Sequence, residues 1–248
     1  MTSYTDIPYS PKGYKECILD VHIPDCDSFP VFVYFHGGGL EKGDKVLKAM
    51  PELLTQNGIA VVSANYRMFP DCNYPDFIED SADCVAWVKN NISKYGSCKG
   101  IYVGGSSAGG YLSMMLCFDK RWYEAAGISN EDISGYVHDA GQPTAHFNVL
   151  KYNGVDPRRV IVDETSPLYH IGEDKAYPPM LFIVSDNDMR NRYEQTMLTL
   201  STLKHFGHGE KIELKLMHGK HCAYCGRVDE DGKSTFGKII LEFIEKYN

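Results

Sequence analysis

The chain has 248 residues, of which 43% are hydrophobic, and a formal net charge of −8 at pH 7. A chain of this length and apolarity can bury one full core, so we expect a single domain over residues 1–248. The negative charge argues against nucleic acid or an anionic membrane as the main partner, because both bind basic faces.

The N-terminal segment and the cysteines indicate the compartment. The first residues lack the basic and apolar segments of a secretory signal, and no apolar run reaches the ~18 residues that span a bilayer. The eight cysteines are scattered, as expected for buried thiols rather than a disulfide framework. These features predict a cytoplasmic protein.

Strand and helix patterns alternate along most of the chain. Period-two alternation over 14–23 predicts a half-exposed leading strand, with Asp20 on its polar side. Continuous apolar runs predict strands buried on both faces at 31–35, 59–64, 101–103 and 180–184. Alternation over 212–216 predicts a strand nearer an edge. Helical spacing predicts helices within 78–92, 112–116, 193–203 and 239–247.

This order of elements predicts an α/β fold, with a mostly parallel twisted sheet covered by helices on both faces. The stretch 119–177 is less regular. We expect it to contain one or two strands, together with lid or substrate-pocket excursions over the carboxyl edge of the sheet, where open α/β sheets bind their ligands.

The strongest chemical signal follows the predicted strand at 101–103. Gly105-x-Ser107-x-Gly109 lies between this strand and a helical pattern, as in a nucleophile elbow, where a strained turn exposes the serine hydroxyl. Ser106 is the rival, although its frame ends in Ala108 rather than glycine. The alternative interpretations are a Gly/Ser-rich turn without a catalytic role and a phosphate-binding loop. The strand–turn–helix context favours Ser107 as the nucleophile.

A second glycine motif follows the strand at 31–35. His36-Gly37-Gly38-Gly39 can curl so that backbone N–H groups point into an open site, as an oxyanion hole requires. We expect the N–H groups of Gly37, Gly38 and Ala108 to be the donors. His36 is expected to support the loop by hydrogen bonding rather than to act as a base.

The acid and the base are expected after later strands. Asp188 follows the strand at 180–184 and is our choice for the acid, with Asp186 in reserve; either could instead cap the next helix. His221 follows the last strand and is our choice for the base, because His218 still has strand spacing. The resulting order is Ser, Asp, His, as in α/β-hydrolases.

A metal site is the competing interpretation of the same segment. His218, His221, Cys222 and Cys225 are potential zinc ligands, but their spacing is tighter than the usual paired arrangement. We therefore predict no metal and no other cofactor.

At this point the chain resembles a known group, the hormone-sensitive-lipase-like and feruloyl-esterase-like carboxylesterases of the α/β-hydrolase fold. The resemblance implies the triad and oxyanion donors named above, but it does not fix the scissile bond, because the group also includes amide-cleaving members. The matching pieces are His36–Gly39, Asn65-Tyr66-Arg67, Asp80 with Trp87-Val88, Gly105–Gly109, Asp188, and Gly219 with His221.

Two departures from the group affect the substrate. Many relatives carry a long N-terminal helical cap, whereas only a short segment precedes the glycine loop here, so we expect little or no cap domain. Many relatives also have an aromatic residue where this chain has Leu40-Glu41-Lys42. The prediction is a serine carboxylic-ester hydrolase acting on a small-molecule or carbohydrate ester, with short-chain, acetyl or feruloyl acyl groups. The alternatives are amide cleavage by the same fold, as a formamidase or a peptidase, a non-catalytic binding protein and a zinc protein. The oligomeric state is not predicted.

Overall fold

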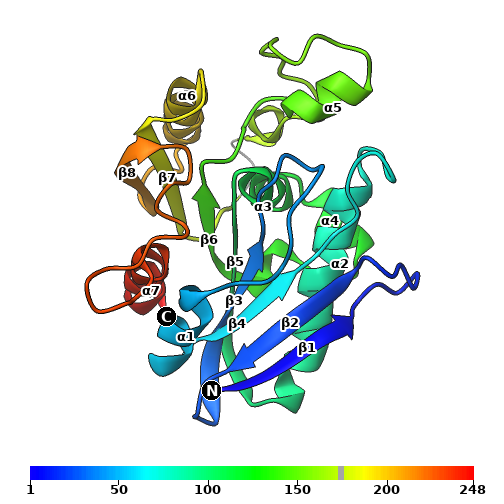
Figure 1. Ribbon diagram of the computed structural model, residues 1–248. Helices are drawn as coiled ribbons and strands as arrows, with labels where there is room; N and C mark the ends of the chain where they lie inside the picture. Colours follow the sequence, from blue (N-terminus) through cyan, green and yellow to red (C-terminus); the bar gives the residue numbers. More distant parts are fainter. Residues whose placement is uncertain (173–175) are drawn as a thin grey trace.

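The computed structural model describes residues 1–172 and 176–248, which build an eight-stranded sheet with helices on both faces (Figure 1). The strand order is β1-β2-β4-β3-β5-β6-β7-β8. Strands β3 to β8 are parallel, and β1 and β2 add an antiparallel edge. The strands are β1 Thr2–Pro8, β2 Ile18–Ile23, β3 Ser28–Phe35, β4 Ala60–Ala64, β5 Ser97–Ser106, β6 Ile133–Asp139, β7 Met180–Asn187 and β8 Ile212–Lys220. The predicted α/β fold class is confirmed.

Apolar side chains on the two faces of the sheet form two cores. Helices α1 (Ala49–Gln56) and α7 (Thr235–Tyr247) cover one face, where they pack on Phe32 and Tyr102. Helices α2 (Asp76–Asn91), α3 (Ala108–Phe118) and α6 (Arg192–His205) cover the other face. Because both faces of β3 and β5 are covered, these strands need the continuous apolar sequence that predicted them.

The antiparallel edge differs from the sequence-based expectation. The leading strand begins at Ile18 rather than near residue 14, and a further strand, β1, pairs with it. Asp20 was expected on a polar face but is buried, because Lys45 Nζ lies 2.8 Å from its carboxylate. Helix α1 was also not predicted, since its short apolar stripe begins without a side-chain cap.

The irregular stretch 119–177 divides at β6. Residues 119–132, with the short helix α4 (Arg121–Ala125), precede β6 and therefore do not lie over the carboxyl edge as expected. Residues 140–172 follow β6 at that edge and include helix α5 (Phe147–Tyr152). Positions 173–175 of the predicted excursion lie outside the described residues.

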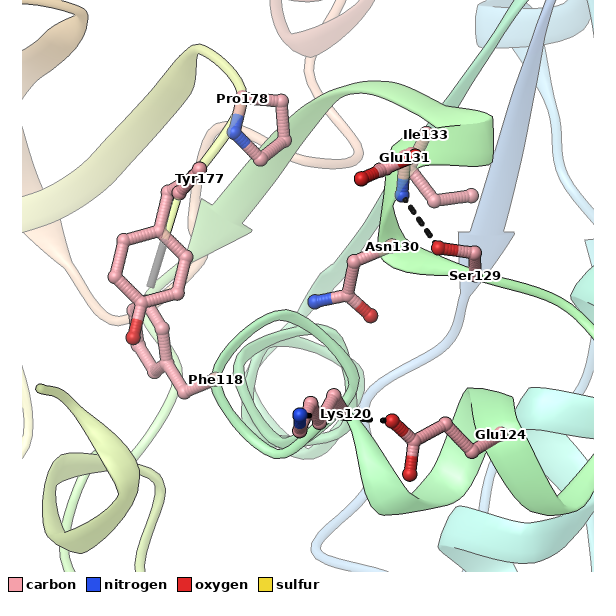
Figure 2. Close-up of a pocket in the computed structure, with 10 residues that line it drawn as sticks. Phe118, Lys120, Glu124, Ser129, Asn130, Glu131, Ile133, Tyr177 and Pro178 are labelled. Atoms are coloured by element: carbon pink, nitrogen blue, oxygen red, sulfur yellow. Dashed lines mark hydrogen bonds and ion pairs between the residues drawn. The ribbon is translucent and has the colours of Figure 1, made fainter. Parts of the chain in front are cut away.

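A cavity of about 680 Å³ lies among residues that precede β6 and β7 (Figure 2). Its walls include Phe118, Asn130, Ile133 and Tyr177. Ile133 is the first residue of β6, whereas Asp139, beside the nucleophile elbow, is the last. The cavity is therefore at the opposite end of the strand from the catalytic candidates and is no pocket for their substrate.

The edge strand β8 pairs only with β7 within the part of the chain that the structure describes. Leu214 and Leu216 on this strand are each 43% exposed. The predicted edge position is confirmed. No helix among residues 1–172 and 176–248 is long and apolar enough to cross a membrane.

Candidate active site

Ser107 lies on the turn between β5 and α3, with φ 57° and ψ −110°. A non-glycine residue at positive φ is strained, and such strain is typical of a nucleophile elbow. The neighbouring glycines allow the turn to pack: a Cβ on Gly109 would lie 1.9 Å from the Phe35 carbonyl oxygen, and one on Gly105 would lie 2.6 Å from the same atom. The glycine spacing therefore follows from close backbone contact between the elbow and β3.

Ser106, the rival nucleophile, faces away from the candidate base. Its hydroxyl donates to Asp139 Oδ2 at 2.5 Å, and the residue is buried. The Ser107 hydroxyl is instead partly exposed and lies 2.8 Å from His221 Nε2. Of the two serines, only Ser107 is therefore positioned to pass a proton to this imidazole.

The structure brings Ser107, His221 and Asp188 into one hydrogen-bonded line. His221 Nδ1 lies 2.5 Å from Asp188 Oδ1, and the Asp188 side chain is 1% exposed. Because a carboxylate only accepts, Nδ1 carries a proton, and Nε2 is the acceptor for the Ser107 hydroxyl. Burial disfavours the charged imidazole, but the hydrogen bond to Asp188 and the neighbouring Cys222 sulfur raise the pKa of His221 above its ordinary value. The site thus stabilises the imidazolium that proton transfer would form.

Asp188 is held in place by the turn that follows β7. Its carboxylate accepts from the backbone N–H of Met189 at 2.7 Å and from that of Ser185 at 3.2 Å. Burial opposes ionisation, yet these bonds and His221 keep the pKa of Asp188 below its ordinary value.

Asp186 forms a separate pair outside the candidate triad. Its Oδ2 lies 2.7 Å from His218 Nδ1, and these side chains are 44% and 90% exposed. The sequence-based choices of Asp188 and His221 over Asp186 and His218 therefore correspond to the pair that reaches Ser107.

The glycine loop after β3 lies against the elbow, as an oxyanion hole requires. A Cβ on Gly37 would lie 3.2 Å from Ser107 Cβ, and Gly38 has φ +116°, a conformation that side chains rarely adopt. Among the described residues, the N–H groups of Gly37, Gly38 and Ala108 have no hydrogen-bond acceptor. Free donors beside a nucleophile suit a developing oxyanion.

Two neighbours hold this loop. The Tyr66 hydroxyl donates to the His36 carbonyl at 2.8 Å, while the two rings stack at 4.5 Å. His36 Nδ1 lies 2.7 Å from the Gly37 carbonyl oxygen, so His36 supports the loop and does not approach Ser107. From α5, Asn148 Nδ2 donates to the Gly39 carbonyl at 2.6 Å. Sequence reasoning missed Asn148, because nothing local in an irregular stretch indicates a contact with residue 39.

Asp139 is a second residue that sequence reasoning missed. It ends β6 directly beside the elbow, is fully buried, and its backbone carbonyl accepts the Ser107 N–H at 2.8 Å. Its carboxylate accepts from Ser106, from the hydroxyl of Tyr224 and, at 3.2 Å, from the thiol of Cys225. Its position in the sequence could have indicated it, because Asp139 is an acidic residue at the carboxyl end of the strand that neighbours the nucleophile strand.

Comparison with known proteins identifies the family of the chain. The BD-FAE family model matches residues 19–150, which include the glycine loop and the elbow. The chain is 35% identical to esterase LipQ of Mycobacterium tuberculosis over 74% of its own length and 48% of that protein. It is 38% identical to carboxylesterase NlhH of the same organism, over 50% of this chain and 43% of that one. The chain thus spans about half the length of these curated relatives.

Solved structures share the whole fold. A truncated carbohydrate esterase from gut microbiota superposes with a TM-score of 0.79 at 19% identity, covering 100% of this chain and 96% of that one. At this identity the likeness concerns the fold alone. Together these matches confirm the resemblance to α/β-hydrolase esterases, and the match over more than half of its residues makes the chain a member of the BD-FAE family.

Proposed function

We propose that this member of the BD-FAE family is a serine carboxylic-ester hydrolase that works through an acyl-enzyme on Ser107. The observation that carries the proposal is the hydrogen-bonded line from Ser107 through His221 to the buried Asp188. A buried carboxylate, an oriented imidazole and a strained, partly exposed serine are the components of nucleophilic acyl transfer.

In the first half-reaction, the Ser107 hydroxyl attacks the ester carbonyl and gives its proton to His221 Nε2. The new imidazolium keeps its Nδ1 hydrogen bond to Asp188, which stabilises the added charge. The carbonyl oxygen becomes an oxyanion beside the N–H groups of Gly37, Gly38 and Ala108. His221 then returns the proton to the leaving alcohol, and the acyl group remains on Ser107.

In the second half-reaction, water takes the place of the alcohol. His221 removes a proton from the water as it attacks the acyl-enzyme, and the same N–H groups face the second oxyanion. Collapse of this intermediate releases the acid and returns the proton to Ser107. The proposed cycle needs no cofactor.

For the substrate class, we propose short-chain acyl esters or acetyl and feruloyl esters of plant-polysaccharide type. Membership of the BD-FAE family and the fold shared with a carbohydrate esterase support this choice. The site is also open, because the His221 side chain keeps 22% of its surface exposed and Ser107 is only partly buried. An open site accepts a bulky alcohol more readily than an enclosed tunnel does.

The test is hydrolysis of p-nitrophenyl acetate, butyrate and octanoate by the wild type and by Ser107→Ala, with Ser106→Ala as the matched control. We expect Ser107→Ala to lose at least ~10³-fold in kcat/KM. Equal losses in the two variants, or activity retained by Ser107→Ala, would refute the assignment.

A second comparison addresses the bond and the acyl group. Methyl ferulate, acetylated xylan and an N-formyl anilide are offered to the same wild-type preparation. We expect turnover of at least one of the two esters to exceed that of the amide. Faster cleavage of the anilide would instead make the chain an amide hydrolase of this fold.

A further inference from the structure

A cluster of side chains that are able to bind metals lies beside the candidate triad, and the proposed esterase mechanism does not use it. A carboxylate oxygen of Asp139 and the sulfur atoms of Cys222 and Cys225 all lie within 4.8 Å of one another. The Cys222 sulfur also lies 3.7 Å from His221 Nε2. Cys222 has φ 51°, so the chain adopts a strained conformation at this thiol.

Three of the separations within this set are short enough for the edges of a tetrahedral site, and His221 Nε2, which lies outside the group of atoms mutually within 4.8 Å, must shift to complete it. Zinc binds thiolate at about 2.3 Å and nitrogen or oxygen at about 2.1 Å, so its ligands lie about 3.6 Å apart. The Asp139 Oδ2 to Cys225 Sγ distance is 3.2 Å, and Oδ2 to Cys222 Sγ is 4.0 Å. The distance from Cys222 Sγ to His221 Nε2 is 3.7 Å. The three measured distances therefore lie on both sides of the ligand separation of about 3.6 Å expected for zinc.

The imidazole already has the tautomer that a metal requires. His221 donates from Nδ1 to Asp188, which leaves the lone pair on Nε2. A carboxylate behind a metal-bound histidine is the usual arrangement at zinc sites, because it fixes the ring and makes the ligand more basic. Tyr224 donates to the other oxygen of Asp139 and orients that carboxylate in the same way.

We propose that Asp139, Cys222 and Cys225, joined by Nε2 of His221 when the cation binds, form a binding site for a thiophilic divalent cation of the zinc class, and that its occupancy blocks Ser107. The ligand set differs from the one considered from the sequence, because His218 bonds to Asp186 and Asp139 lies beside the two cysteines instead. Two sulfur ligands select zinc or cadmium over magnesium and calcium, which prefer oxygen.

The inhibitory part of this inference rests on the proposed function. A single lone pair on Nε2 can accept the Ser107 proton or bind the cation, but not both. The cation would therefore act on the base and leave the elbow and the glycine loop unchanged. We expect inhibition that lowers kcat and is reversed by a chelator.

Cobalt(II) is the first probe, because thiolate ligands to this ion give a near-ultraviolet charge-transfer absorption that reports binding without any turnover. The fully reduced wild-type chain is titrated with Co²⁺ alongside Cys222→Ser, Cys225→Ser and Cys26→Ser. Cys26 is an exposed thiol elsewhere on the surface and is the matched control. We expect one equivalent to saturate the band in the wild type and in Cys26→Ser, and the band to weaken in both other variants.

Zinc inhibition is the second readout. Hydrolysis of p-nitrophenyl butyrate is measured against free Zn²⁺, with each variant compared with its own metal-free rate. We expect Cys225→Ser to raise the half-inhibitory concentration by at least ~10-fold, and Mg²⁺ to have no effect at matched concentration. Thermal unfolding of each variant confirms that it is folded.

The outcomes separate the two proposals. An active chain with no thiolate–cobalt band, or with a band and a zinc response unchanged in Cys222→Ser and Cys225→Ser, would overturn the metal site. A chain that binds cobalt through the cysteines but hydrolyses no ester or amide would overturn the proposed function and leave the site standing.

Discussion

The two aspartates after β7 allow a sharp test of the catalytic assignment. Asp188 and Asp186 each bond to the Nδ1 of a histidine, at 2.5 and 2.7 Å. Their surroundings differ, since the Asp188 side chain is 1% exposed and that of Asp186 is 44% exposed. Replacing each by asparagine removes one negative charge while keeping the size of the side chain.

We expect Asp188→Asn to lower kcat/KM by about 10³–10⁴-fold, because the amide no longer stabilises the imidazolium and can stabilise the wrong tautomer. This range corresponds to about 4–5.4 kcal/mol of transition-state stabilisation. Asp186→Asn changes a solvent-screened pair with His218, whose worth is about 1 kcal/mol or less, and keeps an amide oxygen that can accept from the Gly219 N–H; it does not touch Ser107. We expect its kcat/KM to stay within about 3-fold of the wild type.

The assay is steady-state hydrolysis of p-nitrophenyl butyrate, with thermal unfolding of each variant as the control for folding. The reasoning is refuted if a folded Asp188→Asn loses less than about tenfold, or if Asp186→Asn loses as much as Asp188→Asn. Either result would mean that burial and hydrogen bonding do not identify the acid.

Other sites give three further predictions. We expect Gly109→Ala to destabilise the fold by on the order of 3 kcal/mol, a fall in Tm of roughly 6–12 °C, because its Cβ would lie 1.9 Å from the Phe35 carbonyl oxygen. We expect Asn148→Ala to lower kcat about tenfold with little change in KM, because the Gly39 carbonyl loses its donor and the glycine loop its anchor. Burial favours the neutral form of Asp119, but hydrogen bonds to a neighbouring arginine keep its folded-state pKa below the ordinary value. Its stabilising contribution is therefore present above about pH 4 and lost as pH falls further, so the urea midpoint should fall less between about pH 5 and 3 in Asp119→Asn than in the wild type.

Each of these predictions has its own check. Gly226→Ala is the control for the elbow glycine, because an added Cβ there meets nothing within 4 Å, and equal destabilisation would contradict the packing argument. Asn91→Ala removes a similar amide-to-carbonyl bond on α2 and should leave kcat unchanged. A urea midpoint with the same pH dependence in Asp119→Asn and the wild type would contradict the linkage argument.

Local patterns predicted the parts of the site that depend on local backbone geometry. The elbow around Ser107 and the loop at Gly37 and Gly38 need glycine for steric reasons, because an added Cβ would meet neighbouring backbone. The choice between Asp188 and Asp186 also agrees with the geometry. Its physical reason was not visible in the sequence, since it lies in two backbone N–H bonds within a turn.

Contacts between distant parts of the chain could not be predicted in this way. Asp20 is buried because Lys45 neutralises it, and no pattern in residues 14–23 contains that cation. Asn148 reaches the carbonyl of Gly39 across 109 positions. Asp139 meets Tyr224 across 85 positions, so its network exists only once the sheet has formed. Such residues have ordinary local sequences and gain their roles from topology.

The strand order gives the two halves of the candidate site unequal mechanical support. Ser107 follows β5, which is paired on both sides, whereas His221 follows β8, which within the described residues is attached to the sheet through β7 alone. Edge strands open more readily than central ones. If β8 frays, His221 moves away from Ser107 while the elbow stays intact. On heating, hydrolysis would then stop while most of the molecule is still native, and on cooling the activity would return. The temperature of half-maximal activity should therefore lie below the midpoint of global unfolding.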